Sequence, residues 1–297
     1  MNTVRGIIPP IITPMHEDET VNYTELKNQI GRQIAGGVHG IFCFGTNGEG
    51  YILSMEEKEH VLETAIEAVN GRVPVYAGTG CVSTRETICF SQRAKAMGAD
   101  ILSIITPYFA AISQEELYEH YRAIAEAVDL PIIIYNIPAR TGVNVAPDTI
   151  ARLARIDNIV GAKDSSGNFD NMLQYIERTR GQDFHVLSGN DSLILWNLLA
   201  GGAGGIAGCA NVYPETMVSI YERFVAGDIQ GAREAQDSIR SFRDLFKYGN
   251  PNTVVKGAVA LLGYPVGNCR SPFNKLSPKA IEALRAVLVE NAKNGMK

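Results

Sequence analysis

Lys163 is the residue of this chain whose placement most directly suggests covalent chemistry. It ends the apolar run 159–162 and is the only basic residue in that stretch. A lysine in a water-poor place has a lowered proton affinity, so its neutral amine can attack a carbonyl carbon and form a Schiff base. A lysine at the end of a strand also often extends to solvent or pairs with a neighbour such as Asp164. Lys163 therefore indicates this chemistry only together with other residues.

Further groups suited to carbonyl chemistry follow other short apolar runs. The glycines of Gly45-Thr46-Asn47-Gly48-Glu49 let backbone amides approach a ligand closely and hold a carboxylate. The Tyr135 phenol, one strand from Lys163, could transfer protons through the Thr46 hydroxyl. Arg140 has a planar guanidinium that suits a second carboxylate.

Each of these residues also has an ordinary structural explanation. The glycine loop can be a tight turn, Tyr135 can bond a buried backbone group, and Arg140 can form a surface ion pair. An amine, a phenol, a hydroxyl, an amide-rich loop and a guanidinium at neighbouring strand ends together favour an active site.

The elements that would position these groups form a regular alternation. Each of eight short apolar runs is followed by a helical pattern, and Ser54 with Glu57, Ser83 with Glu86 and Ser113 with Glu116 fit helix capping boxes. Runs that are apolar on both faces are typical of buried parallel strands. The expected strands are 6–12, 39–44, 73–77, 100–105, 131–136, 159–163, 184–188 and 204–208.

This pattern predicts an α/β fold, a (β/α)8 TIM barrel, in which catalytic groups project from the carboxyl ends of the strands. An open doubly wound sheet is the alternative, but no glycine fingerprint follows the first run. After about residue 228 the alternation stops, and helices are expected at 229–248, 252–262 and 277–292. We expect a catalytic barrel over residues 1–227 and a C-terminal helical extension, 228–297, docked on it.

Composition and motifs narrow the possible partners. The net charge is -5 without a basic run, so nucleic acid is not expected as a partner. No run reaches membrane-spanning length and the start of the chain does not resemble a signal peptide, which predicts a cytoplasmic protein without membrane contact. The five cysteines are widely spread, and the five histidines lie far apart, so neither disulfides nor a metal site is expected.

Sequence motifs of nucleotide-binding proteins and hydrolases are missing, or stand next to the wrong secondary-structure elements. The sequence has no phosphate-binding loop with a G-K-[ST] ending, no H-E-x-x-H and no G-x-S-x-G. A G-x-G-x-x-A match at residues 202–207 precedes a strand instead of following one, which is the reverse of the dinucleotide-binding context. No cofactor is expected beyond a covalent imine between substrate and Lys163.

The motifs together resemble the dihydrodipicolinate synthase and N-acetylneuraminate lyase family of class I aldolases. The likeness covers nearly the whole chain, extends to Asn250-Pro251 and Val255-Lys256, and rests on five motifs: Gly45-Thr46-Asn47-Gly48-Glu49, Thr106-Pro107-Tyr108, Tyr135-Asn136-Ile137-Pro138-Ala139-Arg140-Thr141-Gly142, Lys163-Asp164-Ser165-Ser166-Gly167 and Ser188-Gly189-Asn190-Asp191.

The resemblance implies a carbon–carbon lyase that binds pyruvate as an imine on Lys163. Tyr135 would be the proton-shuttling phenol with Thr46 as its partner, and the Thr46-Asn47 backbone would hold the pyruvate carboxylate. Gly189 and Ile206 would line the site, and Arg140 would bind the acid group of the second substrate. The family is usually a homotetramer, a pair of tight dimers acting on a small 2-keto acid and an aldehyde.

Two positions depart from the synthase branch. That branch usually has a second threonine at Asn47, and at Phe109 a second tyrosine that is lent across the tight dimer to complete the proton relay. Phe109 cannot pass a proton. The chain most resembles a dihydrodipicolinate synthase, which condenses pyruvate with aspartate semialdehyde. The alternatives are a 2-keto-3-deoxy sugar acid aldolase or 4-hydroxy-2-oxoglutarate aldolase, and a protein that binds keto acids without turnover.

Overall fold

The computed structural model describes residues 4–273 and 275–297, and the chain divides into two compact units. The first unit is built on Tyr76–Ile206, and the second combines Gly6–Val75 with Ala207–Lys297.

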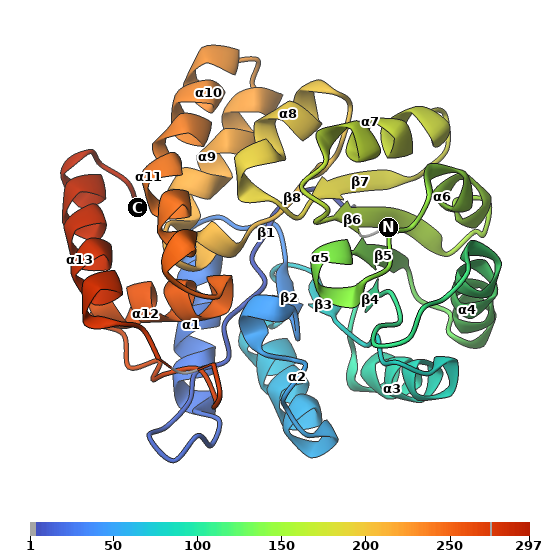
Figure 1. Ribbon diagram of the computed structural model, residues 1–297, viewed down its shortest axis with the longest axis horizontal. Helices are drawn as coiled ribbons and strands as arrows, with labels where there is room; N and C mark the ends of the chain where they lie inside the picture. Colours follow the sequence, from blue (N-terminus) through green and yellow to red (C-terminus); the bar gives the residue numbers. More distant parts are fainter. Residues whose placement is uncertain (1–3, 274) are drawn as a thin grey trace. The chain divides into compact units, whose positions relative to one another are not determined.

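The first unit is a run of parallel strands that alternate with helices. Figure 1 shows β4 to β7 side by side, with α3, α4, α6 and α7 outside them. Its elements are β3 (Val75–Ala77, which begins one residue before the unit), α3 (Thr84–Met97), β4 (Ile101–Ile105), α4 (Gln114–Ala127), β5 (Ile132–Asn136), α5 (Pro138–Thr141), α6 (Pro147–Leu153), β6 (Ile159–Asp164), α7 (Phe169–Arg178), β7 (His185–Ser188), η2 (Asp191–Leu193), α8 (Ile194–Leu199) and β8 (Gly204–Ile206).

The second unit joins the start of the chain to its C-terminal helices. The segment after β1 meets β2 through an isolated parallel bridge between Pro10 and Phe42. Its elements are β1 (Gly6–Ile8), α1 (Tyr23–Ala35), β2 (Ile41–Cys43), η1 (Thr46–Gly48), α2 (Met55–Val69), η3 (Gly208–Asn211), α9 (Pro214–Val225), α10 (Ile229–Ser238), α11 (Arg240–Arg243), η4 (Asp244–Tyr248), α12 (Pro251–Leu261) and α13 (Pro278–Lys293).

Local sequence signals account for most element boundaries. Ser54 and Ser113 form complete capping boxes with Glu57 and Glu116. At Ser83 only the hydroxyl caps the amide of Glu86, and the Glu86 carboxylate accepts from the Ser83 hydroxyl instead of from its backbone. The predicted box is therefore half formed at α3.

The fold class is the predicted (β/α)8 barrel with a C-terminal helical region. All eight expected strands are present. The sheet order is β1-β8-β7-β6-β5-β4-β3-β2, so strands that follow one another in the chain from β2 to β8 are neighbours in the sheet, and β1 lies next to β8. Within the first unit the neighbouring strands pair in parallel from β3 to β8. Among the described residues, no helix is both long and apolar enough to cross a membrane.

The expected helix 229–248 is wrong in one respect, because it is divided into α10, α11 and η4. Ile239, Phe242 and Leu245 are all buried and lie three residues apart. Ile239 and Phe242 lie before the 3-10 turn η4, and Leu245 lies within it. Residues three apart share one face of a 3-10 turn, so the tighter winding keeps Leu245 on the buried face. The predicted boundary between residues 227 and 228 differs from the division of the two compact units and stays a prediction.

Candidate active site

Lys163 and Tyr135 lie side by side at the carboxyl ends of β6 and β5. The two residues are partners in the parallel register, so their side chains project from adjacent strands in the same direction. The Lys163 Nζ lies 3.7 Å from the centroid of the Tyr135 ring. Both residues are 4% exposed, so the amine is held in a place with little access to bulk water. The structure thus brings together the amine and the phenol that the sequence singled out.

Gly189 provides the space that the Lys163 side chain occupies. A Cβ built on Gly189 would lie 2.9 Å from the Lys163 Cε and would overlap the hydroxyl of Ser165. The Gly189 amide donates a hydrogen bond of 2.8 Å to the backbone carbonyl of Asp164, which fixes this approach. Any larger residue at this position would push against the lysine.

The Asp164 carboxylate anchors the end of β6 on the side away from Lys163. It accepts hydrogen bonds from the Asn136 side chain (2.8 Å), the Ser166 hydroxyl (2.7 Å) and the Asn171 side chain (3.4 Å). Burial raises the pKa of Asp164 above its usual value, and these hydrogen bonds partly oppose that shift. The sequence analysis did not single out this network, although polar residues at adjacent strand ends are the signal for it.

The other predicted residues of the first unit lie at strand ends of the same unit. Arg140 is exposed on α5, directly after β5, and Ile206 is the last residue of β8 and is 1% exposed. Thr106, directly after β4, is fully buried, and within residues 4–273 and 275–297 its hydroxyl has no hydrogen-bond partner. Its backbone amide donates to the carbonyl of Tyr135 (3.2 Å), which places an unused hydroxyl next to the strand that carries the phenol.

Phe109 has an unusual conformation for a large aromatic residue. Its φ of 82° lies in the left-handed region, and its side chain is 99% exposed. Positive φ is uncommon for residues other than glycine, and such strain concentrates at functional positions.

Thr46 and Asn47 belong to the second unit, in the short turn η1 after β2. The turn packs tightly on the segment after β1, because a Cβ on Gly48 would lie 2.7 Å from the Ile11 carbonyl oxygen. The Thr13 hydroxyl donates a hydrogen bond of 2.7 Å to the Gly48 carbonyl. The side-chain oxygen of Asn47 is buried and has no hydrogen-bond partner among the described residues.

Glu49, the residue that ends this turn, forms a buried ion pair that the sequence analysis missed. Its carboxylate lies 2.7 Å from the Nζ of Lys256 on α12, and both side chains are at most 1% exposed. The signal was available, because Lys256 is a single basic residue in the apolar stretch Val254–Leu261, as Lys163 is in its own strand.

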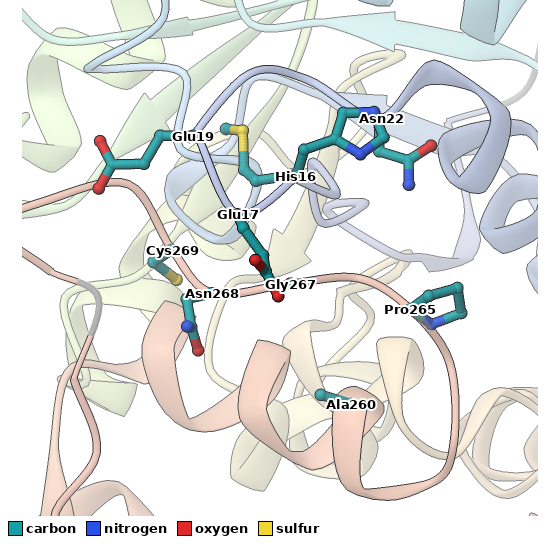
Figure 2. Close-up of a pocket in the computed structure, with 10 residues that line it drawn as sticks. His16, Glu17, Glu19, Asn22, Ala260, Pro265, Gly267, Asn268 and Cys269 are labelled. Atoms are coloured by element: carbon teal, nitrogen blue, oxygen red, sulfur yellow. The ribbon is translucent and has the colours of Figure 1, made fainter.

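A cavity of about 450 Å³ lies elsewhere in the second unit. Figure 2 shows it between the segment around His16 and the segment that carries Cys269, with Glu17 and Glu19 at its wall. None of the predicted site residues lines it. Among the described residues, no group of three or more His, Cys, Asp or Glu side chains is arranged to hold a metal ion.

The comparisons with known proteins agree on one family. The model of the dihydrodipicolinate synthetase family matches residues 3–291. A 4-hydroxy-tetrahydrodipicolinate synthase of Methanoculleus marisnigri is 42% identical over 96% of this chain and 99% of the relative. A second such synthase, from Natronomonas pharaonis, is 41% identical over 97% of this chain and 98% of its own length.

Solved structures give the same result for the fold. The chloride-inhibited dihydrodipicolinate synthase of Acinetobacter baumannii, complexed with pyruvate, superimposes with a TM-score of 0.94 at 38% identity, covering 98% of this chain and 99% of the other. The prophage protein YagE of Escherichia coli K12, also complexed with pyruvate, gives 0.94 at 32% identity, covering 97% and 99%. This chain therefore belongs to the dihydrodipicolinate synthetase family, a family of carbon–carbon lyases of the aldolase type.

Proposed function

We propose that this protein condenses pyruvate with aspartate semialdehyde through a Schiff base on Lys163, as a 4-hydroxy-tetrahydrodipicolinate synthase. The observation that carries the proposal is the buried Lys163 amine, 3.7 Å from the Tyr135 ring centroid at neighbouring strand ends. Two relatives with this activity in their names are 42% and 41% identical to the chain along nearly its whole length.

The chemistry follows from the amine. Neutral Lys163 adds to the keto carbon of pyruvate, and uptake of one proton with loss of water leaves a protonated imine. The imine draws electrons from the adjacent methyl group, which loses a proton and becomes the terminal carbon of an enamine. That carbon attacks the aldehyde, and hydrolysis of the new imine returns the amine. Cleavage of a longer keto acid is the same path reversed.

The remaining predicted residues take roles that match their chemistry. Tyr135 transfers the protons, with Thr46 as its partner, because a phenol beside the amine can act as both donor and acceptor. The backbone of Thr46 and Asn47 holds the pyruvate carboxylate, and Gly189 and Ile206 line the site. Arg140 binds the acid group of the aldehyde, since a guanidinium pairs with a carboxylate in two parallel hydrogen bonds.

A second activity is favoured by two side chains. The buried side-chain oxygen of Asn47, which has no partner in the part of the chain that the structure describes, would accept a hydrogen bond from a substrate hydroxyl. Phe109 has no hydroxyl for a proton relay. These features fit cleavage of 2-keto-3-deoxy sugar acids or of 4-hydroxy-2-oxoglutarate.

The decisive experiment traps the imine. Incubation with pyruvate and borohydride should add about 72 Da, pyruvic acid less one oxygen atom, to the peptide that contains Lys163. Lys163→Arg keeps the charge but stays protonated, so no adduct should form, whereas Lys95→Arg at the surface should react as the parent does. A parent protein that gains no mass on Lys163 would contradict the proposal.

A substrate panel then separates the activities. Condensation of pyruvate with aspartate semialdehyde is measured beside pyruvate release from 2-keto-3-deoxy acids, 4-hydroxy-2-oxoglutarate and neuraminate. The largest kcat/KM identifies the reaction. An adduct without turnover of any compound would instead favour the protein that binds keto acids without reaction.

Assembly into a homotetramer and a cytoplasmic location are further parts of this proposal. The Phe109 side chain is 99% exposed, and its burial against another copy of the chain would remove this apolar surface from water. Light scattering on the purified protein tests the tetramer, and Phe109→Ser should shift it toward smaller species.

A further inference from the structure

A buried cluster of charged groups lies beneath the turn that carries Thr46 and Asn47. The Glu49 carboxylate accepts a hydrogen bond from the Lys256 Nζ through one oxygen (2.7 Å) and from the Arg270 backbone amide through the other (2.8 Å). The Glu49 and Lys256 side chains are 0% and 1% exposed. All three residues belong to the second unit.

Glu49 is joined to the turn by its own backbone. It ends η1 in the left-handed region, with φ of 57°, and its amide donates to the carbonyl of Thr46 (3.2 Å). Helix α12, which carries Lys256, packs against η1. Movement of the Glu49 side chain would therefore move the backbone of Thr46 and Asn47.

The opposite side of the turn is also fixed. Gly48 lies against the Ile11 carbonyl so closely that a Cβ would lie 2.7 Å from its oxygen, and Thr13 donates to the Gly48 carbonyl. The turn is thus held between the segment after β1 and helix α12. A shift of either support is transmitted to the amides between them.

Stability alone does not explain an ion pair in this place. The free-energy cost of removing two charges from water offsets most of their attraction. Proteins in which apolar residues of similar size replace a buried ion pair are often as stable. A buried pair does define one geometry, because either charge left alone is strongly unfavourable. A site that must hold a small carboxylate by backbone amides depends on such geometry.

We infer that Glu49 and Lys256 are positioning residues, which set the Thr46–Asn47 amides at the place where they bind the carboxylate of the keto acid. The inference rests on the proposed function, since it assigns the carboxylate of that reaction to this turn. It predicts a defect in keto-acid binding that is separable from loss of stability.

The test compares single and double replacements in the full-length protein. Glu49→Gln leaves a buried ammonium without its partner, so its melting temperature should fall. In Glu49→Gln with Lys256→Met, both charges are gone, methionine replaces the lysine stem, and the glutamine oxygen still accepts from Arg270. The double variant should recover most of the melting temperature, yet the pyruvate concentration for half-maximal adduct formation should rise about tenfold with a smaller change in kcat.

Two controls separate position from stability and from the proposed function. Ile220→Ala removes a buried side chain on α9, so it should lower the melting temperature without changing half-saturation by pyruvate. Hydrogen exchange of the peptide that contains residues 46–49 should be faster in the double variant than in Ile220→Ala. If the parent formed no adduct, the proposed function would fail, and this exchange rate would still decide whether the pair positions the turn.

The inference is overturned if the double variant matches the parent in both half-saturation and exchange of this segment. Should the double variant not fold, Glu49→Asp serves instead, because it keeps the charge but shortens the side chain by one carbon. The turn must then shift toward Lys256, or the ion pair with Lys256 is lost. Parent-like values of both the half-saturating pyruvate concentration and the hydrogen exchange of residues 46–49 would equally overturn the inference.

Discussion

Gly189 and Lys163 lie so close together that the chain tolerates no side chain at residue 189. A Cβ there would lie 2.9 Å from the Lys163 Cε, which is shorter than ordinary contact between carbon atoms. The Lys163 amine therefore keeps its orientation beside the Tyr135 ring partly because residue 189 has no side chain.

Replacement of Gly189 by alanine should disable the amine while the protein stays folded. The added methyl group forces the lysine or Ser165 to move, and misplacement by about 1 Å lowers such rates by roughly a hundredfold. The rate of borohydride-trapped adduct formation measures the effect. Gly31→Ala is the matched control, because a Cβ at Gly31 meets no atom within 4 Å and alanine favours the helix; it should react as the parent does.

Replacement of Tyr135 by phenylalanine should slow turnover and leave pyruvate binding largely intact. The ring that packs on the Lys163 amine remains, and only the hydroxyl that we propose as the proton-transfer group is lost. General acid–base groups contribute about 10²- to 10⁴-fold, so kcat should fall by that amount with little change in the KM for pyruvate. Steady-state kinetics test this, and a kcat within threefold of the parent's would assign proton transfer to another group.

Replacement of Arg140 by methionine should affect the aldehyde and spare the keto acid. Arg140 is exposed on α5, so loss of its charge should not unfold the protein. If it binds the acid group of the aldehyde, the KM for aspartate semialdehyde should rise about tenfold, in line with loss of a charge-assisted hydrogen bond. The half-saturating pyruvate concentration in the trapping reaction is the internal control; an equal rise in both values would place Arg140 elsewhere.

The barrel and the pairing of Lys163 with Tyr135 could be predicted because short-range patterns determine them. Apolar runs bounded by turns define the strands, and in a parallel sheet the polar residue after each run must project at the same edge. The register of β5 and β6, which pairs Tyr135 with Lys163, agrees with that expectation.

Contacts between residues far apart in the chain could not be predicted in the same way. Glu49 and Lys256 are 207 residues apart, and no local pattern links a turn residue to one lysine among the C-terminal helices. The resemblance placed Gly189 at the site, but its close approach to the Lys163 Cε depends on how β6 and β7 pack and could not be predicted. The division of 229–248 into shorter pieces depended on a three-residue spacing that also fits an interrupted amphipathic helix.

The buried carboxylate of Asp164 should make the stability of the protein depend on pH. Its pKa is raised above the usual 3.8, first by burial, so the folded state keeps the proton at pH values where the unfolded chain has lost it. Stability should therefore be greatest below that usual value, fall as the pH rises through the raised pKa, and then level off.

Asp164→Asn should remove this dependence and keep the hydrogen bonds. Its amide oxygen can accept from Asn136 as Asp164 does, and the Ser166 hydroxyl can turn to accept from the new amide nitrogen. The difference in the free energy of unfolding, variant minus parent, should grow as the pH rises from about 4 through the raised pKa of Asp164, as measured by urea denaturation.

Asp164→Leu, which leaves these donors unpaired, should instead destabilise the protein by about 1–3 kcal/mol. Asp157→Asn on the exposed surface is the control and should change stability by less than about 0.5 kcal/mol. Parallel curves for Asp164→Asn and the parent over this range would show that Asp164 does not titrate with folding.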